Sequence, residues 1–175
     1  MTIHDTHPFA DSDPDPARRF RARVGGAVCL WTSGEGRNRA GLTVTSLMIA
    51  LGEPAQVLAL LDPDSDLTDA LRETGRAVVS PLAWTDRDLA EAFAGTAPAP
   101  GGPFRVAAFT DTEWGPRLAP AATWAGVELV EEREVGWSAL VACRLVEVEV
   151  GDDPSSGVLG HRRGRFVRWA EPSGG

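Results

Sequence analysis

The sequence predicts a mainly antiparallel β-barrel with a few short helices packed on its outside. Short apolar or alternating segments, bounded by Gly, Pro, Asp and Ser, recur along the 175 residues, as in strands joined by turns. The helical patterns are short and do not alternate regularly with the strands, which argues against a parallel Rossmann sheet. In residues 135–150 the alternating pattern slips by one position after Leu145, which predicts a bulge of the kind that bends barrel strands.

The first half of the chain predicts a helix over 16–23 and strands over 24–32, 41–51 and 56–61. Segment 33–39 is rich in glycine and arginine and has the composition of a hairpin turn. Along the strand that follows, even-numbered residues from Leu42 would share one face and odd-numbered residues from Thr43 the other. Residues 56–61 are almost purely apolar, so we expect burial on both faces of that strand.

The second half predicts two more helices and a return to strands. Ser65 or Asp66 caps a helix that runs through Thr74 and ends at Gly75. The other helix opens within 85–88 and ends at Gly95. Strands are expected over 77–82, 124–134, 135–150 (with Gly136 near the turn) and 165–169, and loops over 96–102 and 151–157.

The chain predicts one folded domain over 17–170, between a disordered acidic leader over 1–16 and a flexible end over 171–175. The leader lacks the apolar core of a signal peptide. No segment approaches the ~18–20 consecutive apolar residues of a membrane span. We therefore expect a cytoplasmic protein without a membrane partner. Cys29 and Cys143 lie in apolar segments and are expected to be buried free thiols.

Composition excludes several kinds of chemistry. The formal net charge of -8 argues against a nucleic-acid partner, which needs clustered positive charge. All 17 basic residues are arginine, so no Schiff-base or P-loop lysine exists. Of the three histidines, His4 and His7 fall in the predicted leader, which leaves His161 and no His or Cys cluster for a metal. An enzyme of this composition relies on a bound cofactor for its chemistry.

An ordered set of motifs gives the sequence a family resemblance. Residues 41–46 read Gly-x-Thr-x-x-Ser, and a Pro54 turn, an apolar strand and an Asp/Ser-rich turn over 62–66 follow. Residues 75–82 read Gly-x-x-x-Val-x-x-Leu, a helix of Asp-x-x-Leu-Ala-x-x-Phe-Ala type comes next, and 161–166 read His-Arg-Arg-Gly-Arg-Phe. Over residues 18–168 the chain resembles the flavin reductase family, which has the FMN-binding split-barrel fold of antiparallel Greek-key type.

The resemblance implies a flavin site around the Gly-x-Thr-x-x-Ser strand. Short hydroxyls there let the backbone approach a flavin ring, and helix N-terminal N–H groups or arginine forks suit its phosphate. The expected cofactor-binding residues are Arg37, Arg39, Thr43, Val44, Thr45, Ser46, Asp62, Ser65 and Ser80. Each also has a plain alternative reading: strand propensity for the threonines, an ordinary helix cap for Ser65, turn formation for Asp62 and a solvated loop for the arginines.

The resemblance also places His161 near the open face of the flavin. There it would position nicotinamide or flavin, and with Arg163 and Arg165 it would bind the nicotinamide nucleotide; the alternative is a surface histidine on a loop. Hydride transfer needs two stacked rings and no acid or base from the protein, so no residue is expected to be catalytic in the strict sense. No metal ligands are expected.

The expected function is reduction of FMN, or alternatively FAD, by NADH or NADPH in a homodimer, which would supply reduced flavin to a partner monooxygenase. Two alternatives stay open: an enzyme on the same fold that keeps its flavin, or the deazaflavin F420, and reduces another substrate, and a non-catalytic flavin- or haem-type-binding protein.

Overall fold

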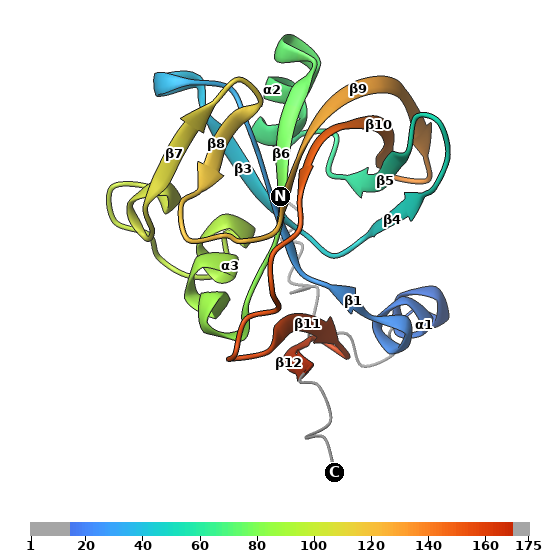
Figure 1. The fold of residues 1–175 in the computed structure, drawn as a ribbon. Helices are drawn as coiled ribbons and strands as arrows, with labels where there is room; N and C mark the ends of the chain where they lie inside the picture. The colour runs from blue at the N-terminus through green and yellow to red at the C-terminus, as the bar shows by residue number, and fades with distance from the viewer. Residues whose placement is uncertain (1–14, 170–175) are drawn as a thin grey trace, which may run out of the picture.

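A curved seven-stranded sheet forms the centre of the computed structural model, which describes residues 15–169 (Figure 1). Each neighbouring pair of strands is antiparallel. In spatial order the strands are β3 (Ala40–Val44), β2 (Cys29–Ser33), β6 (Arg76–Pro81), β9 (Trp124–Val135), β10 (Ser138–Glu149), β5 (Gln56–Leu61) and β4 (Leu47–Ala50). The predicted antiparallel barrel-type architecture is thereby confirmed.

The two edge strands of this sheet are consecutive in the chain. Only Thr45 and Ser46 separate β3 from β4, and the Leu60 N–H donates to the Ser46 carbonyl at 3.0 Å. The predicted single strand over 41–51 is therefore wrong in detail: it is one kinked segment that joins opposite edges of the sheet and curls it toward closure. Because the alternation breaks at the kink, Val44 and Leu47 both pack into the interior.

The interior of the barrel is an apolar cluster. Trp31, Val57, Leu61, Val141 and Cys143 are almost fully buried in it. In β5 the burial alternates, and Leu60 keeps 40% of its surface exposed. The expected burial of both faces of 56–61 is therefore not found within one chain, because the outer face of β5 has no layer of this chain over it.

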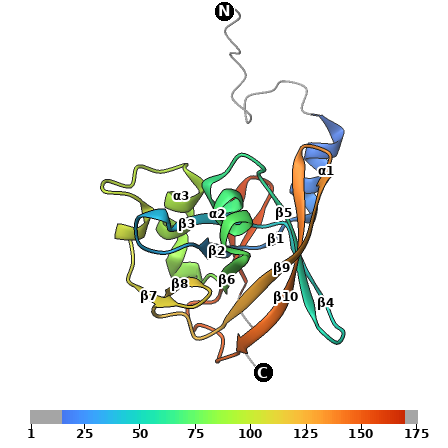
Figure 2. The same ribbon diagram turned by 90° about the horizontal axis from the view of Figure 1, so that it is seen from above.

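Helices α2 (Asp66–Thr74) and α3 (Arg87–Ala94) lie outside the barrel and end as predicted (Figure 2). The Ser65 hydroxyl caps α2 by accepting from the Thr68 N–H. Gly75 and Gly95 end the helices in the left-handed conformation, which glycine adopts without strain. Three short 3₁₀ segments complete the helical part: η1 (Gly36–Asn38), η2 (Trp84–Asp86) and η3 (Pro103–Arg105).

A second, three-stranded sheet lies at one end of the barrel, in the order β1 (Gly26–Ala27), β11 (Val158–Arg162) and β12 (Arg165–Trp169). Helix α1 (Pro16–Val24) precedes it. The predicted strand over 24–32 is thus two strands in different sheets. His161 lies within β11, which the sequence did not predict, rather than on a loop. The hairpin of β7 (Phe109–Thr112) and β8 (Gly115–Leu118) was also not predicted.

The long β9–β10 hairpin confirms the predicted bulge, since its register shifts between Leu145 and Glu147 and again between Ala142 and Cys143. Cys29 and Cys143 are free and buried, as expected. Asp15 caps α1 and Pro16 begins it, while the rest of the predicted leader, with His4 and His7, and the predicted C-terminal end over 171–175 lie outside the described residues. Within residues 15–169 no helix is long and apolar enough to cross a membrane.

Candidate functional site

The junction between β3 and β4 exposes backbone polar groups at the place where the barrel edges meet. Thr45 and Ser46 are both exposed, and among the described residues neither N–H group has a backbone partner. The Ser46 hydroxyl donates to the Leu60 carbonyl at 2.7 Å and fixes the junction beside the end of β5. The junction is therefore an accessible edge, held by hydrogen bonds to Leu60, with free donors.

A glycine allows β1 to pack directly on this junction. A Cβ atom at Gly26 would lie 2.5 Å from the Thr45 carbonyl oxygen, so no larger residue fits without displacing the junction. Gly26 pairs with His161 of β11. One backbone strand therefore separates the Thr45 segment from the His161 segment.

His161 is half-buried in the middle strand of the small sheet. Its ring meets that of Phe166 edge to face, with 5.7 Å between centroids. Burial, and secondly the positive charge of Arg21, lower the pKa of His161 below its usual range. The imidazole is consequently neutral at pH 7, with one nitrogen to donate and one to accept a hydrogen bond.

The end of β5 leads from the junction into the N-terminus of α2. An Asp62 carboxylate oxygen accepts from the Asp64 N–H at 2.9 Å. The Ser65 hydroxyl accepts from the Thr68 N–H at 3.2 Å and lies 3.0 Å from the Asp62 carbonyl. Both side chains thus form the turn and the cap, the plain alternative given by the sequence. Helix α2 begins five residues after β5, and the N–H groups of its first turn, from Asp66 on, favour an anion.

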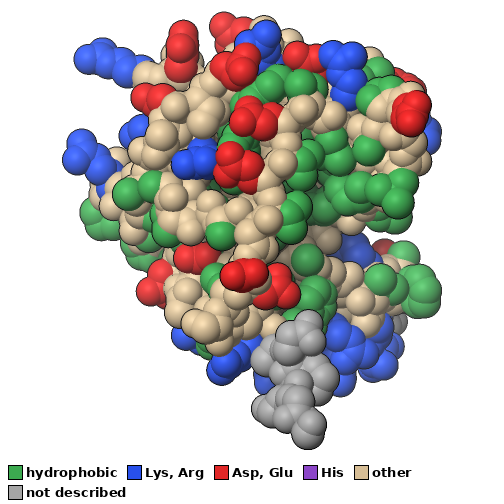
Figure 3. Space-filling model, in the orientation of Figure 1, with side chains coloured by type: hydrophobic (Ala, Val, Ile, Leu, Met, Phe, Trp, Pro, Cys, Tyr) green, Lys and Arg blue, Asp and Glu red, His purple; other side chains and the backbone are tan. Residues whose placement is uncertain are grey.

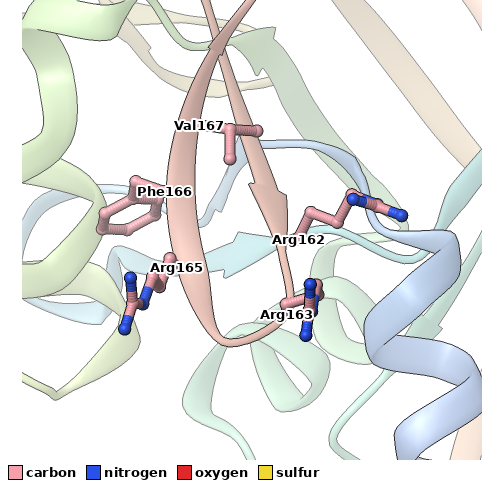
Figure 4. Close-up of a pocket in the computed structure, with 5 residues that line it drawn as sticks. All are labelled: Arg162, Arg163, Arg165, Phe166 and Val167. Carbon is pink, nitrogen blue, oxygen red and sulfur yellow. The ribbon is translucent and has the colours of Figure 1, made fainter.

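The β11–β12 hairpin forms an arginine-lined pocket of about 430 Å³ (Figure 4). It is lined by Arg162, Arg163, Arg165, Phe166 and Val167. Figure 4 shows Arg162 pointing toward α1, with Arg165 and Phe166 on the other side of the hairpin. The Arg162 Nε donates to the Arg23 carbonyl at 2.9 Å, and the Arg163 N–H donates to the Ala22 carbonyl at 2.7 Å. The hairpin is therefore tied to the C-terminal end of α1.

The other predicted residues lie away from the junction or point elsewhere. The Thr43 hydroxyl donates to the Ala90 carbonyl of α3 at 2.6 Å, and Val44 is buried in the barrel interior. Ser80 is buried on β6 opposite Leu30. The remaining two, Arg37 and Arg39, lie at the tip of the β2–β3 hairpin, at the far end of β3, where the Arg39 guanidinium stacks over Phe104 at 4.5 Å. Flavin contact by these residues stays a prediction.

Two residues that shape the site were missed. Gly26 carries the close contact with Thr45, and Arg21 acts on the pKa of His161. The Gly25-Gly26 pair directly before an apolar strand was a usable signal, because paired glycines mark close backbone approaches. Arg21 had no sequence signal, since it is one of four arginines in α1. Within residues 15–169 no three His, Cys, Asp or Glu side chains cluster to hold a metal ion.

Comparison with known proteins decides the family. The sequence pattern described as "Flavin reductase like domain" matches residues 21–170. The chain belongs to the flavin reductase-like domain family. Over 143 residues, covering 75% of this chain and 80% of the relative, it is 29% identical to the protein named "FMN reductase (NADH) RutF 2" of Methylorubrum extorquens. The predicted family and class of enzyme are confirmed.

Solved structures of flavin reductases share the fold. SgcE6, an NADH:FAD oxidoreductase of Streptomyces globisporus, superposes with a TM-score of 0.77 at 21% identity, over 91% of this chain and 96% of its own. The styrene monooxygenase flavin reductase of Pseudomonas putida S12 superposes with a TM-score of 0.76 at 21% identity, over 91% of this chain and 100% of its own. BorF, the flavin reductase component of a bacterial two-component tryptophan halogenase, superposes with a TM-score of 0.77 at 21% identity, over 89% of this chain and 98% of its own.

Proposed function

We propose that this protein reduces FMN or FAD with a reduced nicotinamide nucleotide, and that the β3–β4 junction holds the flavin. The family match supports the reaction, and the name of the RutF relative supports FMN and NADH as the working pair. The observation that carries the placement is the exposed Thr45-Ser46 backbone, whose N–H groups have no backbone partner within residues 15–169. Such free donors on an accessible edge suit the polar rim of a flavin ring.

The residues around the junction fit the parts of a flavin. The Thr45 hydroxyl and the two free N–H groups suit the ring edge and the sugar-derived chain, and the first N–H groups of α2 suit a phosphate. The close approach of Gly26 leaves no side chain between the junction and β1. Bound flavin supplies the ring that accepts the hydride.

The task of the chain is then to orient two rings and to keep the nucleotide in place. The neutral His161 imidazole, one strand away from Thr45, offers a hydrogen bond to the nicotinamide. Arg163 and Arg165 are exposed on the same hairpin, and within the described residues neither forms an ion pair. Their guanidinium forks suit the phosphates of the dinucleotide. Holding the two rings in a reactive geometry lowers the barrier of a hydride transfer that needs no protein acid or base.

The outer face of β4, β5 and β10 supports a homodimer. On this face Met48 (70% exposed) pairs with Leu58, and Leu60 pairs with Leu140. Figure 3 shows the hydrophobic surface gathered on the β4 side of the molecule. An exposed apolar sheet face is typical of a protein interface, and it explains why β5 is apolar on both faces. A second copy would bury it through an isologous contact.

The partner and the location follow from the same function. BorF is named as the flavin reductase component of a two-component halogenase, and another similar structure is named as the flavin reductase of styrene monooxygenase. These names support release of reduced flavin to a monooxygenase. Free buried thiols support a reducing, cytoplasmic location. The folded domain would extend over 17–170.

Flavin-stimulated oxidation of NADH and NADPH by the purified protein tests the proposal. The expected result is saturable NADH oxidation that depends on added FMN or FAD. A protein that is yellow as isolated and reduces another acceptor would show a retained flavin, and one that binds flavin without oxidising either nucleotide would show a binding protein. Absence of both binding and turnover would refute the proposal.

A further inference from the structure

Helix α1 presents its two large apolar side chains to solvent and not to its own chain. Phe20 and Val24 lie four residues apart, on one face of the helix, and are 73% and 66% exposed. Ala22, which lies on the opposite face, is the one half-buried residue of α1. Arg19 and Arg23 flank the apolar stripe, and among the described residues no arginine of α1 forms an ion pair. An amphipathic helix whose apolar stripe faces solvent is typical of an interaction surface.

The tip of the β9–β10 hairpin has the complementary chemistry. Trp137 is 85% exposed there and borders a depression of about 490 Å³ between the hairpin and the start of α2. The depression is lined by Pro63, Asp64, Arg72, Glu132, Glu134, Trp137, Ser138 and Ala139.

The charge in this depression is negative. Arg72 donates to both carboxylate oxygens of Glu132, which lowers the pKa of Glu132 and fixes that wall. Asp64 and Glu134 have no ion-pair partner within residues 15–169. An apolar ring with free carboxylates beside it suits an arginine-rich helix that carries a phenylalanine.

We propose that α1 of one copy docks on the β9–β10 tip of a second copy, with Phe20 against the partner's Trp137 and arginines beside the partner's Asp64 and Glu134. The inference rests on the homodimer of the proposed function and assigns the contact that orients it. A membrane is a poorer occupant, because two apolar side chains on a nine-residue helix bury little area, and it would leave the acidic depression unmatched.

The positions of the two elements allow the contact to occur twice. Figures 1 and 2 place α1 and the β9–β10 turn on the same side of the molecule. A two-fold axis between them brings each α1 against the other copy's hairpin and packs the two outer sheet faces together. Because Arg162 and Arg163 bond to carbonyls of α1, docking also holds the β11–β12 hairpin and its His161.

Charge reversal on both sides tests the proposal by sedimentation equilibrium of the full chain. Arg19→Glu and Glu134→Arg should each weaken the dimer about tenfold or more, since each places like charges together. The double variant should return to within about threefold of the wild-type dissociation constant. Arg105→Glu and Asp111→Arg are matched controls on exposed residues elsewhere in the chain and should leave the dimer unchanged.

Three outcomes would overturn the proposal: single reversals without effect, a double variant no tighter than the weaker single, or wild-type dimer strength in Phe20→Ala. Binding of the wild type, but not of Phe20→Ala, to phosphatidylglycerol vesicles would assign α1 to a membrane instead. The masses are measured without flavin or nucleotide. A rescued dimer without flavin turnover therefore refutes the proposed function alone, and turnover in an unaffected dimer refutes this contact alone.

Discussion

Replacing Gly26 by alanine should displace the β3–β4 junction and weaken flavin binding. The added Cβ atom would lie 2.5 Å from the Thr45 carbonyl oxygen, against 3.4–4 Å for ordinary contact. The atoms must separate by about 1 Å, and overpacking of this size costs about 1–3 kcal/mol. Because the contact is backbone on one side, no flexible side chain can relieve it. The displacement falls on the groups that we assign to the flavin.

Two measurements separate the effects on stability and on the site. The midpoint temperature of thermal unfolding should fall by roughly 2–12 °C, because each kcal/mol lost lowers it by about 2–4 °C in a chain of this size. Titration followed by quenching of FMN fluorescence should give a dissociation constant about tenfold larger or more for Gly26→Ala than for the wild type. Gly52→Ala is the matched control, since its nearest neighbour is an ordinary 3.5 Å contact and its φ is not positive. Unchanged FMN affinity in a folded Gly26→Ala protein would refute the role of the Thr45 segment.

Three further predictions follow from other contacts. Because the pKa of His161 is lowered in the folded protein, the unfolded chain binds the proton more readily, and the free energy of unfolding should fall as pH drops below about 6.5. In an NMR titration Arg21→Gln should raise the pKa of His161, and His161→Gln assigns the signal. An unchanged pKa in Arg21→Gln would contradict the geometry. Burial raises the pKa of Cys29 and Cys143 to about 12, so a thiol reagent at pH 8 should modify neither until the protein unfolds; fast labelling of the folded protein would contradict their burial. Leu60→Asp, on the apolar outer face, should give a folded monomer by light scattering, and an unchanged dimer would place the interface elsewhere.

Local signals in the sequence were sufficient for much of the barrel. The prediction of a helix bounded by Ser65 and Gly75 was correct because capping chemistry is local. The bulge after Leu145 was visible because a half-buried strand must alternate, so a slip in phase has a structural cause.

Elements that depend on distant partners were harder to predict. Residues 41–51 look like one strand, because nothing local shows that its two halves pair with opposite edges of the sheet. Strand β11 is short and ends in an arginine-rich turn, so its composition resembles a loop. The β7–β8 hairpin has polar residues, a glycine and a proline, and depends on Trp114, which lies flat against Gly126 of β9. Apolarity on both faces of β5 predicted that both would be buried, whereas Leu60 on its outer face keeps 40% of its surface exposed in the single chain.

The candidate site could be predicted only in part, for the same reason. Exposed Thr45 and Ser46 are adjacent in the sequence and in the structure, so the motif located them. His161 lies across β1 from them only because Gly26 pairs with it, a relation that a single sequence does not contain. Whether a hydroxyl points outward is equally a tertiary property: the Thr43 side chain bonds to α3 and not to solvent.

A crystal structure of the protein soaked with FMN tests the central claim most directly. The account predicts density for the flavin ring along the Thr45-Ser46 backbone, within hydrogen-bond distance of its N–H groups, with the phosphate toward the start of α2 and His161 on the side of β1. Density for FMN at another surface, with the junction bare, would contradict the account.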